Sequence, residues 1–124
     1  MATTTLFGRE WTERELRERV SDMSQLASVQ RSALAEGKAR GAEQVQLTLA
    51  GGFALTLSAD RCLDVGAASW CGVPLASITP PRTVGAAFAE EESPTGFARS
   101  FGAGLVYTCG LTGESPPGSV PGCD

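Results

Sequence analysis

Two short runs with period-two alternation constrain the fold of this chain more than any other feature of its sequence. In Gln44–Leu49 and Phe53–Ser58 every second residue is large and apolar, the pattern of strands buried on one face. Opposed residues of an antiparallel pair share a face. A two-residue loop, Gly51-Gly52, would oppose Thr48 to Leu55 and mix the two faces, whereas a three-residue loop, Ala50-Gly51-Gly52, opposes apolar residues to apolar ones. A hairpin with a left-handed glycine in its loop is therefore predicted. The expected pairs are Leu49 with Phe53, Leu47 with Leu55, and Val45 with Leu57.

Weaker patterns predict an all-β, mainly antiparallel protein with one short N-terminal helix. The helix, over 12–20, begins with the capping box Thr12-Glu13-Arg14-Glu15. The other expected elements are a strand over 25–34, a turn at 36–38, a strand through Leu63, Val65 and Ala67, a turn at Cys71-Gly72, a return strand over 73–75, a long solvated loop over 82–96, and a strand over 105–111 that is apolar enough to be buried on both faces.

The length of 124 residues fits one domain, expected over 1–112, followed by a Gly/Pro/Ser-rich disordered tail over 113–124. The net charge of −4 argues against a nucleic-acid binder that works by bulk positive charge. The first residues show no secretory signal and no later run is long enough to span a membrane, so we expect a cytoplasmic protein with no membrane partner.

The four cysteines are then expected to be reduced thiols. With no histidine in the chain, a zinc site would need all four of these scattered cysteines, and no Cys-x-x-Cys spacing is present. Cys62 and Cys109 lie in apolar runs, which favours buried structural cysteines. No metal and no cofactor is expected.

Arg61, Arg82 and Arg99 are the only basic residues after residue 40, and each stands alone. Arg61 lies between Asp60 and Asp64, which would share a face if this run were a continuous strand. A guanidinium with flanking carboxylates is suited to binding vicinal hydroxyls through paired hydrogen bonds. The alternative is an internal ion pair that fixes the start of the strand.

Five blocks of the sequence, in order and in spacing over about residues 6–113, resemble one known family. They are Leu6-Phe7-Gly8-Arg9-x-Trp11, Ser21-Asp22-Met23-Ser24-Gln25-Leu26-Ala27, Asp60-Arg61-Cys62-Leu63-Asp64-Val65-Gly66, Gly72-Val73-Pro74-Leu75, and Phe101-Gly102-Ala103-Gly104-Leu105-Val106-Tyr107-Thr108-Cys109-Gly110-Leu111-Thr112. The family is the uncharacterised aldose 1-epimerase-like branch of the galactose mutarotase-like superfamily.

This resemblance implies the N-terminal part of a large antiparallel β-sandwich that binds a sugar in a cleft and, in well-understood relatives, interconverts anomers. It implies that Arg61 and Arg99 bind sugar hydroxyls, that Asp60 or Asp64 orients Arg61, and that Thr108 lines the cleft. Mutarotation needs an acid and a base. The superfamily supplies a histidine and a carboxylate from later parts of its chains, and members typically continue into a His-Gly-Arg segment that is absent here.

Three hypotheses follow from these observations. In the first, the chain is the N-terminal portion of a carbohydrate-binding, epimerase-like isomerase and has no catalytic residue of its own. In the second, it is a complete, non-catalytic β module that binds a partner or self-associates through open sheet edges. The third, an active mutarotase of this length, lacks a credible acid partner for carboxylates such as Glu43 or Asp64.

Overall fold

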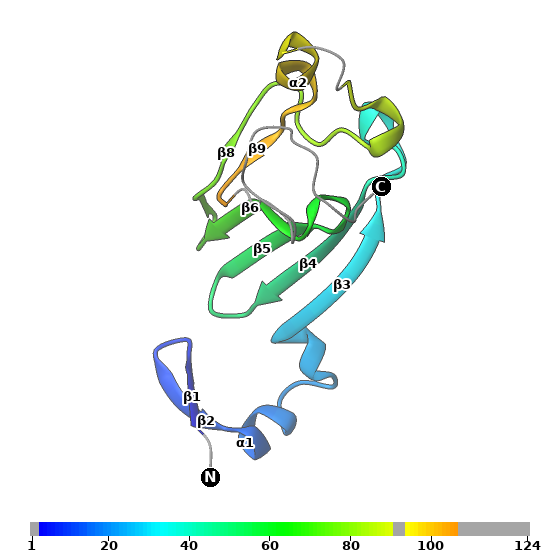
Figure 1. Cartoon of the computed structure of the whole chain (residues 1–124). Coiled ribbons are helices and arrows are strands. Elements are labelled where there is room, and N and C mark those ends of the chain that lie inside the picture. Colours follow the sequence, from blue (N-terminus) through cyan, green and yellow to red (C-terminus); the bar gives the residue numbers. More distant parts are fainter. Residues whose placement is uncertain (1–2, 91–93, 107–124) are drawn as a thin grey trace, which may run out of the picture.

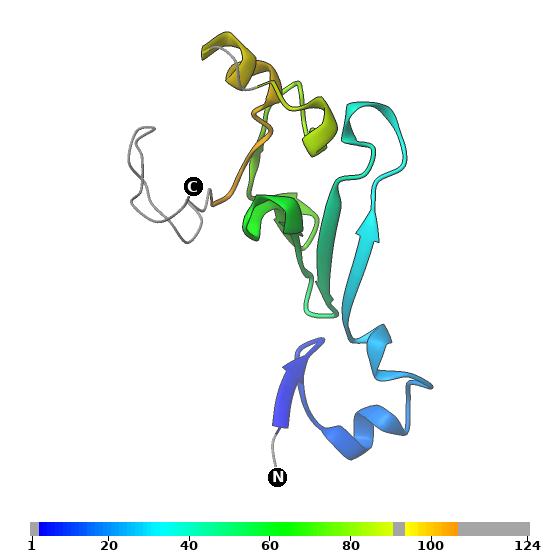
Figure 2. The same cartoon turned by 45° about the vertical axis from the view of Figure 1, so that its right-hand side comes forward.

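The computed structural model describes residues 3–90 and 94–106, and antiparallel strands dominate these residues (Figures 1 and 2). The prediction of a mainly antiparallel β protein is confirmed. In chain order the elements are β1 (Thr3–Leu6), β2 (Arg9–Thr12), α1 (Glu13–Arg17), β3 (Ala27–Ala33), β4 (Glu43–Leu49), β5 (Phe53–Ser58), β6 (Asp64–Trp70), β7 (Val73–Pro74), β8 (Ser77–Ile78), α2 (Pro94–Ser100) and β9 (Ala103–Gly104), with 3-10 turns at Met23–Gln25, Gly37–Ala39, Ala59–Arg61 and Ala86–Phe88.

The main sheet has five strands in the order β3-β4-β5-β6-β7, so each strand pairs with its sequence neighbour. β8 and β9 form a separate short pair, which lies beside the β6 end of the main sheet (Figure 1). After β9 the chain bonds to β6 directly, because the Leu105 N–H donates to the Val65 carbonyl at 2.8 Å. The β1–β2 hairpin and α1 lie at the opposite end of the molecule in both views (Figures 1 and 2).

The β4–β5 hairpin has the predicted register. Val45 opposes Leu57 and Leu47 opposes Leu55, which confirms the three-residue loop. Gly52 takes the left-handed conformation with φ +93°. A Cβ at this position would lie 2.7 Å from Cys71 Sγ, so glycine is needed there for space as well as for backbone conformation.

The strand after the hairpin begins later than expected. β6 starts at Asp64, because Cys62 and Leu63 are both left-handed, with φ of 52° and 64°, and turn the chain. The expectation that Asp60 and Asp64 share the face of one strand is therefore wrong. The predicted turn at Cys71-Gly72 and the return strand β7 are confirmed.

The capping box at the start of α1 is confirmed in both of its bonds. The Thr12 N–H donates to Glu15 Oε2 at 2.8 Å, and the Glu15 N–H donates to Thr12 Oγ1 at 3.3 Å. The bond from the Thr12 N–H, together with one that the Thr12 hydroxyl donates to the same carboxylate oxygen at 2.9 Å, lowers the pKa of Glu15 below its ordinary value of 4.5. The helix ends at Arg17, earlier than predicted, since Leu16 is its one buried residue and so thin an apolar stripe gives little packing to extend it.

Three further expectations need correction or lie outside the described residues. The expected loop over 82–96 contains the Ala86–Phe88 turn and the start of helix α2. Cys62 is exposed rather than buried. Of the strand expected over 105–111 only Leu105 and Val106 are described, each about half exposed, and Cys109 and the tail over 113–124 lie outside the described residues.

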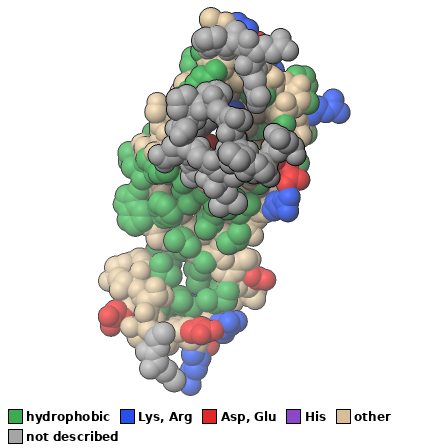
Figure 3. Space-filling view, viewed as in Figure 1, with side chains coloured by type: hydrophobic (Ala, Val, Ile, Leu, Met, Phe, Trp, Pro, Cys, Tyr) green, Lys and Arg blue, Asp and Glu red, His purple; other side chains and the backbone are tan. Residues whose placement is uncertain are grey.

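Apolar side chains remain widely exposed on this sheet. The buried apolar residues among those described are Leu16, Ala42, Ala68 and Val84, and no large side chain there is completely buried. Figure 3 shows apolar side chains gathered over the left and middle of the sheet, with charged ones on its margins. α1 and α2 have five and seven residues, and within 3–90 and 94–106 no helix is long and apolar enough to cross a bilayer.

Candidate functional site

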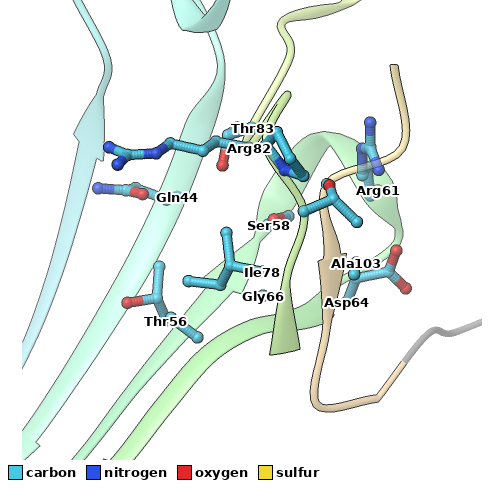
Figure 4. A pocket seen from close by; sticks show the side chains of 14 residues that line it. Gln44, Thr56, Ser58, Arg61, Asp64, Gly66, Ile78, Arg82, Thr83 and Ala103 are labelled. Atoms are coloured by element: carbon cyan, nitrogen blue, oxygen red, sulfur yellow. The ribbon is translucent and has the colours of Figure 1, made fainter. Parts of the chain in front are cut away.

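A pocket of about 670 Å³ lies where the polar face of the main sheet meets the chain around β8 and β9 (Figure 4). Its walls come from β4, β5, the turn after β5, β6, the loop after β8, and β9. The lining residues are Gln44, Thr56, Ser58, Arg61, Asp64, Gly66, Ala67, Ile78, Thr79, Pro80, Arg82, Thr83, Gly102 and Ala103. Its volume falls within the range of about 300 to 1,000 Å³ typical of small-molecule sites.

Two glycines allow β9 to close the pocket. A Cβ on Gly104 would lie 2.5 Å from the Val65 carbonyl oxygen, and one on Gly102 would lie 2.5 Å from the Arg82 carbonyl oxygen. Both distances are too short for any other residue without a shift of backbone. The glycines therefore let one short strand pack against β6 and against the Thr79–Thr83 loop together.

Arg61 lines the pocket from the turn between β5 and β6. Its Nη2 donates to the Ser100 carbonyl oxygen at 2.8 Å, and Ser100 is buried at the end of α2. This bond joins residues that are 39 positions apart in the chain. Arg61 therefore holds α2 in place and also contributes to the pocket wall.

Asp64 is the most buried polar residue in the described part of the chain, with 6% of its surface exposed. It is the first residue of β6 and is among the residues that line the pocket. It lies on the same side as Arg61 (Figure 4). The left-handed residues just before it set this position, because they reverse the chain between the two side chains. The predicted Arg61 and Asp64 thus come together at one pocket.

Asp60 lies outside this pocket. One of its carboxylate oxygens, Oδ2, accepts a hydrogen bond from the Glu43 N–H at 2.8 Å, and the Glu43 carboxylate in turn pairs with the guanidinium of Arg31. This pairing, with a smaller contribution from Asp60, raises the pKa of Arg31. Asp60 is therefore bonded to the start of β4 and not to the pocket lining.

Arg99 is also outside the pocket. Its Nε donates to Glu90 Oε2 at 2.7 Å, and Lys38 Nζ lies 3.7 Å from the other carboxylate oxygen. The hydrogen bond from Arg99 is the main reason that the pKa of Glu90 is below its ordinary value of 4.5. The last predicted site residue, Thr108, lies outside the described residues.

The sequence interpretation missed the polar residues of the hairpin. Gln44 opposes Ser58, and Gln46 opposes Thr56, so the face opposite the apolar one carries amides and hydroxyls. Three of these four residues, Gln44, Thr56 and Ser58, line the pocket. The alternation that predicted the strands contained this signal, since it marks a polar face as clearly as an apolar one.

The loop that covers this polar face supplies another missed residue, Arg82. Thr79, Pro80 and Pro81 precede it and form a turn that is closed by the Arg82 N–H donating to the Thr79 carbonyl at 3.0 Å. In Figure 4 the Arg82 side chain extends toward Gln44, across the pocket from Arg61 and Asp64. Two of the three isolated arginines therefore reach one pocket.

A comparison with known protein families matches the part of the chain that contains this pocket. Residues 39–123 match the family model described as Domain of unknown function (DUF4432). The chain belongs to this family. Every residue that lines the pocket of this DUF4432 protein falls within the matched range, whereas β1, β2, α1 and β3 precede it.

Neither the curated proteins nor the solved structures contain a match to this DUF4432 chain.

Proposed function

We propose that this DUF4432 protein binds a carbohydrate in the pocket between the polar face of the sheet and the Thr79–Thr83 loop, as an aldose 1-epimerase-like protein. The observation that carries the proposal is the convergence of Arg61 and the buried Asp64 on a pocket whose floor is built from hairpin hydroxyls and an amide. The resemblance of the Asp60–Gly66 block to the aldose 1-epimerase-like family supports the same assignment.

The lining chemistry suits a polyhydroxylated ligand. Each sugar hydroxyl is both a donor and an acceptor. A guanidinium supplies donors only, a carboxylate supplies acceptors only, and Ser and Thr hydroxyls supply both. Arg61 and Asp64, with Thr56 and Ser58 of β5, offer these groups within one pocket. Ile78 adds an apolar side chain, which suits the C–H face of a sugar ring.

The proposed activity of this chain is binding, with no catalytic residue assigned. Anomer interconversion requires a proton acceptor and a proton donor that can exchange roles. Asp64 is the one carboxylate among the residues that line the described pocket, and the chain contains no histidine.

The test compares two neighbouring aspartates by titration calorimetry with glucose and galactose. Asp64→Asn removes an acceptor charge from the pocket, and we expect affinity to fall about tenfold or more, the usual cost of losing a hydrogen bond to a charged group. Asp60→Asn is the matched control, because Asp60 is not among the residues that line the pocket and its carboxylate accepts a hydrogen bond from the Glu43 N–H instead. An equal loss of affinity in both variants would contradict the proposal.

We propose a second candidate, a non-catalytic module that self-associates through its open sheet edge. β3 is the outer strand of the main sheet, and its Val29 is 72% exposed although it pairs with Leu47 on the apolar face. An unprotected edge beside an exposed apolar surface favours pairing with a second chain.

Sedimentation velocity of the protein and of Val29→Lys tests the second candidate. A charge at this edge position should convert a dimer into a monomer, whereas Gln30→Lys, on the opposite face of the same strand, should disturb association less. A protein that is monomeric at every concentration would eliminate this candidate.

A further inference from the structure

The pocket contains more positive than negative charge, although the chain as a whole has a net charge of −4. Arg61, Arg82 and Asp64 are the charged residues that line it. Arg61 and Asp64 lie on one side, and Arg82 lies on the other beside Gln44 (Figure 4). A ligand that spans the pocket therefore meets a second guanidinium at the end away from Asp64.

Within residues 3–90 and 94–106, none of the ion pairs includes Arg82. Arg99 of the same late region is different, since Glu90 neutralises it. A guanidinium in a concave site with no described carboxylate partner is available to an anionic ligand, which it can bind through two parallel hydrogen bonds.

The backbone of Arg82 is held in a conformation that arginine does not favour. Its φ is +59°, a left-handed value that costs a residue with a Cβ free energy relative to glycine. Two contacts fix it there: the turn bond from its N–H to Thr79, and the close packing of Gly102 on its carbonyl. Strained residues that the surrounding structure holds in place gather at ligand sites.

We propose that the ligand of this pocket is an anionic sugar, whose phosphate or carboxylate group binds the Arg82 guanidinium while its hydroxyls bind Arg61 and Asp64. This inference rests on the proposed carbohydrate binding and specifies the class of sugar. Phosphate and carboxylate share the planar pair of acceptor oxygens that the guanidinium fork recognises. Gln44, next to Arg82 in Figure 4, places an amide at the same end of the pocket.

The experiment measures the affinity of the full chain for glucose, glucose 6-phosphate, glucuronate and inorganic phosphate by titration calorimetry. We expect at least one of the two anionic sugars to bind about tenfold or more tightly than glucose, as a charge-assisted bidentate bond implies. This advantage should shrink as the salt concentration rises from about 0.05 M to 0.5 M, because the site is open to solvent ions.

Arg82→Gly is the decisive variant, since it removes the guanidinium and relieves the left-handed strain. Its unfolding midpoint in urea should equal or exceed that of the unaltered protein, so a loss of affinity cannot be attributed to misfolding. We expect affinity for the anionic sugar to fall by more than affinity for glucose, so that the preference for the anionic sugar disappears. Arg40→Ala is the matched control, because it removes the same charge from an exposed residue outside the pocket lining.

The inference is overturned if glucose binds as tightly as both anionic sugars, or if Arg82→Gly keeps the preference. It is also overturned if inorganic phosphate binds as tightly as glucose 6-phosphate, because the site would then recognise an anion alone. In the first two cases the proposed carbohydrate binding still stands. If none of the three sugars binds, both proposals fail together.

Discussion

The β4–β5 hairpin and the rim of the pocket both contain left-handed backbone, but at different types of residue. Both turn the chain through left-handed conformations. The hairpin uses Gly52 for this, whereas the pocket rim uses Cys62, Leu63, Arg82 and Ala103. Glycine adopts these conformations at the lowest cost, so the four rim positions carry backbone strain that the hairpin avoids. Of the four rim residues, Arg82 and Ala103 are among those that line the pocket.

The largest expected effect is a loss of stability when the left-handed glycine of the hairpin is replaced. Gly52→Ala should destabilise the protein by about 2 to 4 kcal/mol, because it adds left-handed strain to an overlap with Cys71. The Cβ would lie 2.7 Å from Cys71 Sγ and 3.3 Å from the Cys71 backbone. The free energy of unfolding in urea measures this loss.

Gly72→Ala provides the control for Gly52→Ala. Gly72 has φ +81° but no atom within 4 Å of its missing Cβ, so this change adds strain without overlap and should cost about 1 to 2 kcal/mol. Equal losses for the two variants would show that close packing at Gly52 contributes nothing.

A smaller effect, of opposite sign, is expected for a left-handed residue that lies outside the pocket lining. Cys71 is also left-handed, with φ 48°, but it is exposed and lies in the tight turn between β6 and β7. Asn-Gly is the preferred sequence for such a turn. Cys71→Asn should therefore raise the free energy of unfolding by about 0.5 to 1 kcal/mol and leave sugar affinity unchanged. A loss of sugar affinity in this variant would extend the functional rim beyond the pocket.

The smallest expected effect is a difference in pKa shift between two carboxylates. Glu15 lies in the first turn of α1, and Glu90 pairs with Arg99 of α2. The pKa of Glu15 is lowered chiefly by hydrogen bonds from Thr12, whereas that of Glu90 is lowered chiefly by the bond from the charged Arg99. Each carboxylate therefore stabilises the fold fully above its ordinary pKa of 4.5, and this stabilisation is lost as the pH falls through the lowered pKa of the folded state.

Salt distinguishes the two carboxylates, because it screens an exposed ion pair more than a local hydrogen bond. In about 1 M NaCl the pKa of Glu90 should rise toward its ordinary value more than the pKa of Glu15 does. Carbon-detected NMR titration of the two carboxyl groups measures both values in one sample. A larger rise for Glu15 would mean that its interaction with Arg9 and Arg19 outweighs the capping box.

The regular part of the fold could be predicted because its signals are local. The hairpin register follows from alternation and loop length, and the capping box from residues three apart. The start of β6 could not be predicted, since nothing in Asp60–Gly66 shows that Cys62 and Leu63 turn the chain. Asp60 was for this reason expected on one face with Asp64, whereas Arg61 and Asp64 line the pocket and Asp60 does not.

By itself the sequence determined a hairpin with one apolar and one polar face, and three arginines that stand apart from other basic residues. Only the tertiary structure decided that the polar face is covered by the β8–β9 pair, and that Arg61 and Arg82 reach it while Arg99 pairs with Glu90. The physical reason is sequence distance. Strand pairing depends on neighbours within a few residues, whereas the pocket joins Gln44 of β4 to Ala103 of β9 through packing that no local pattern records.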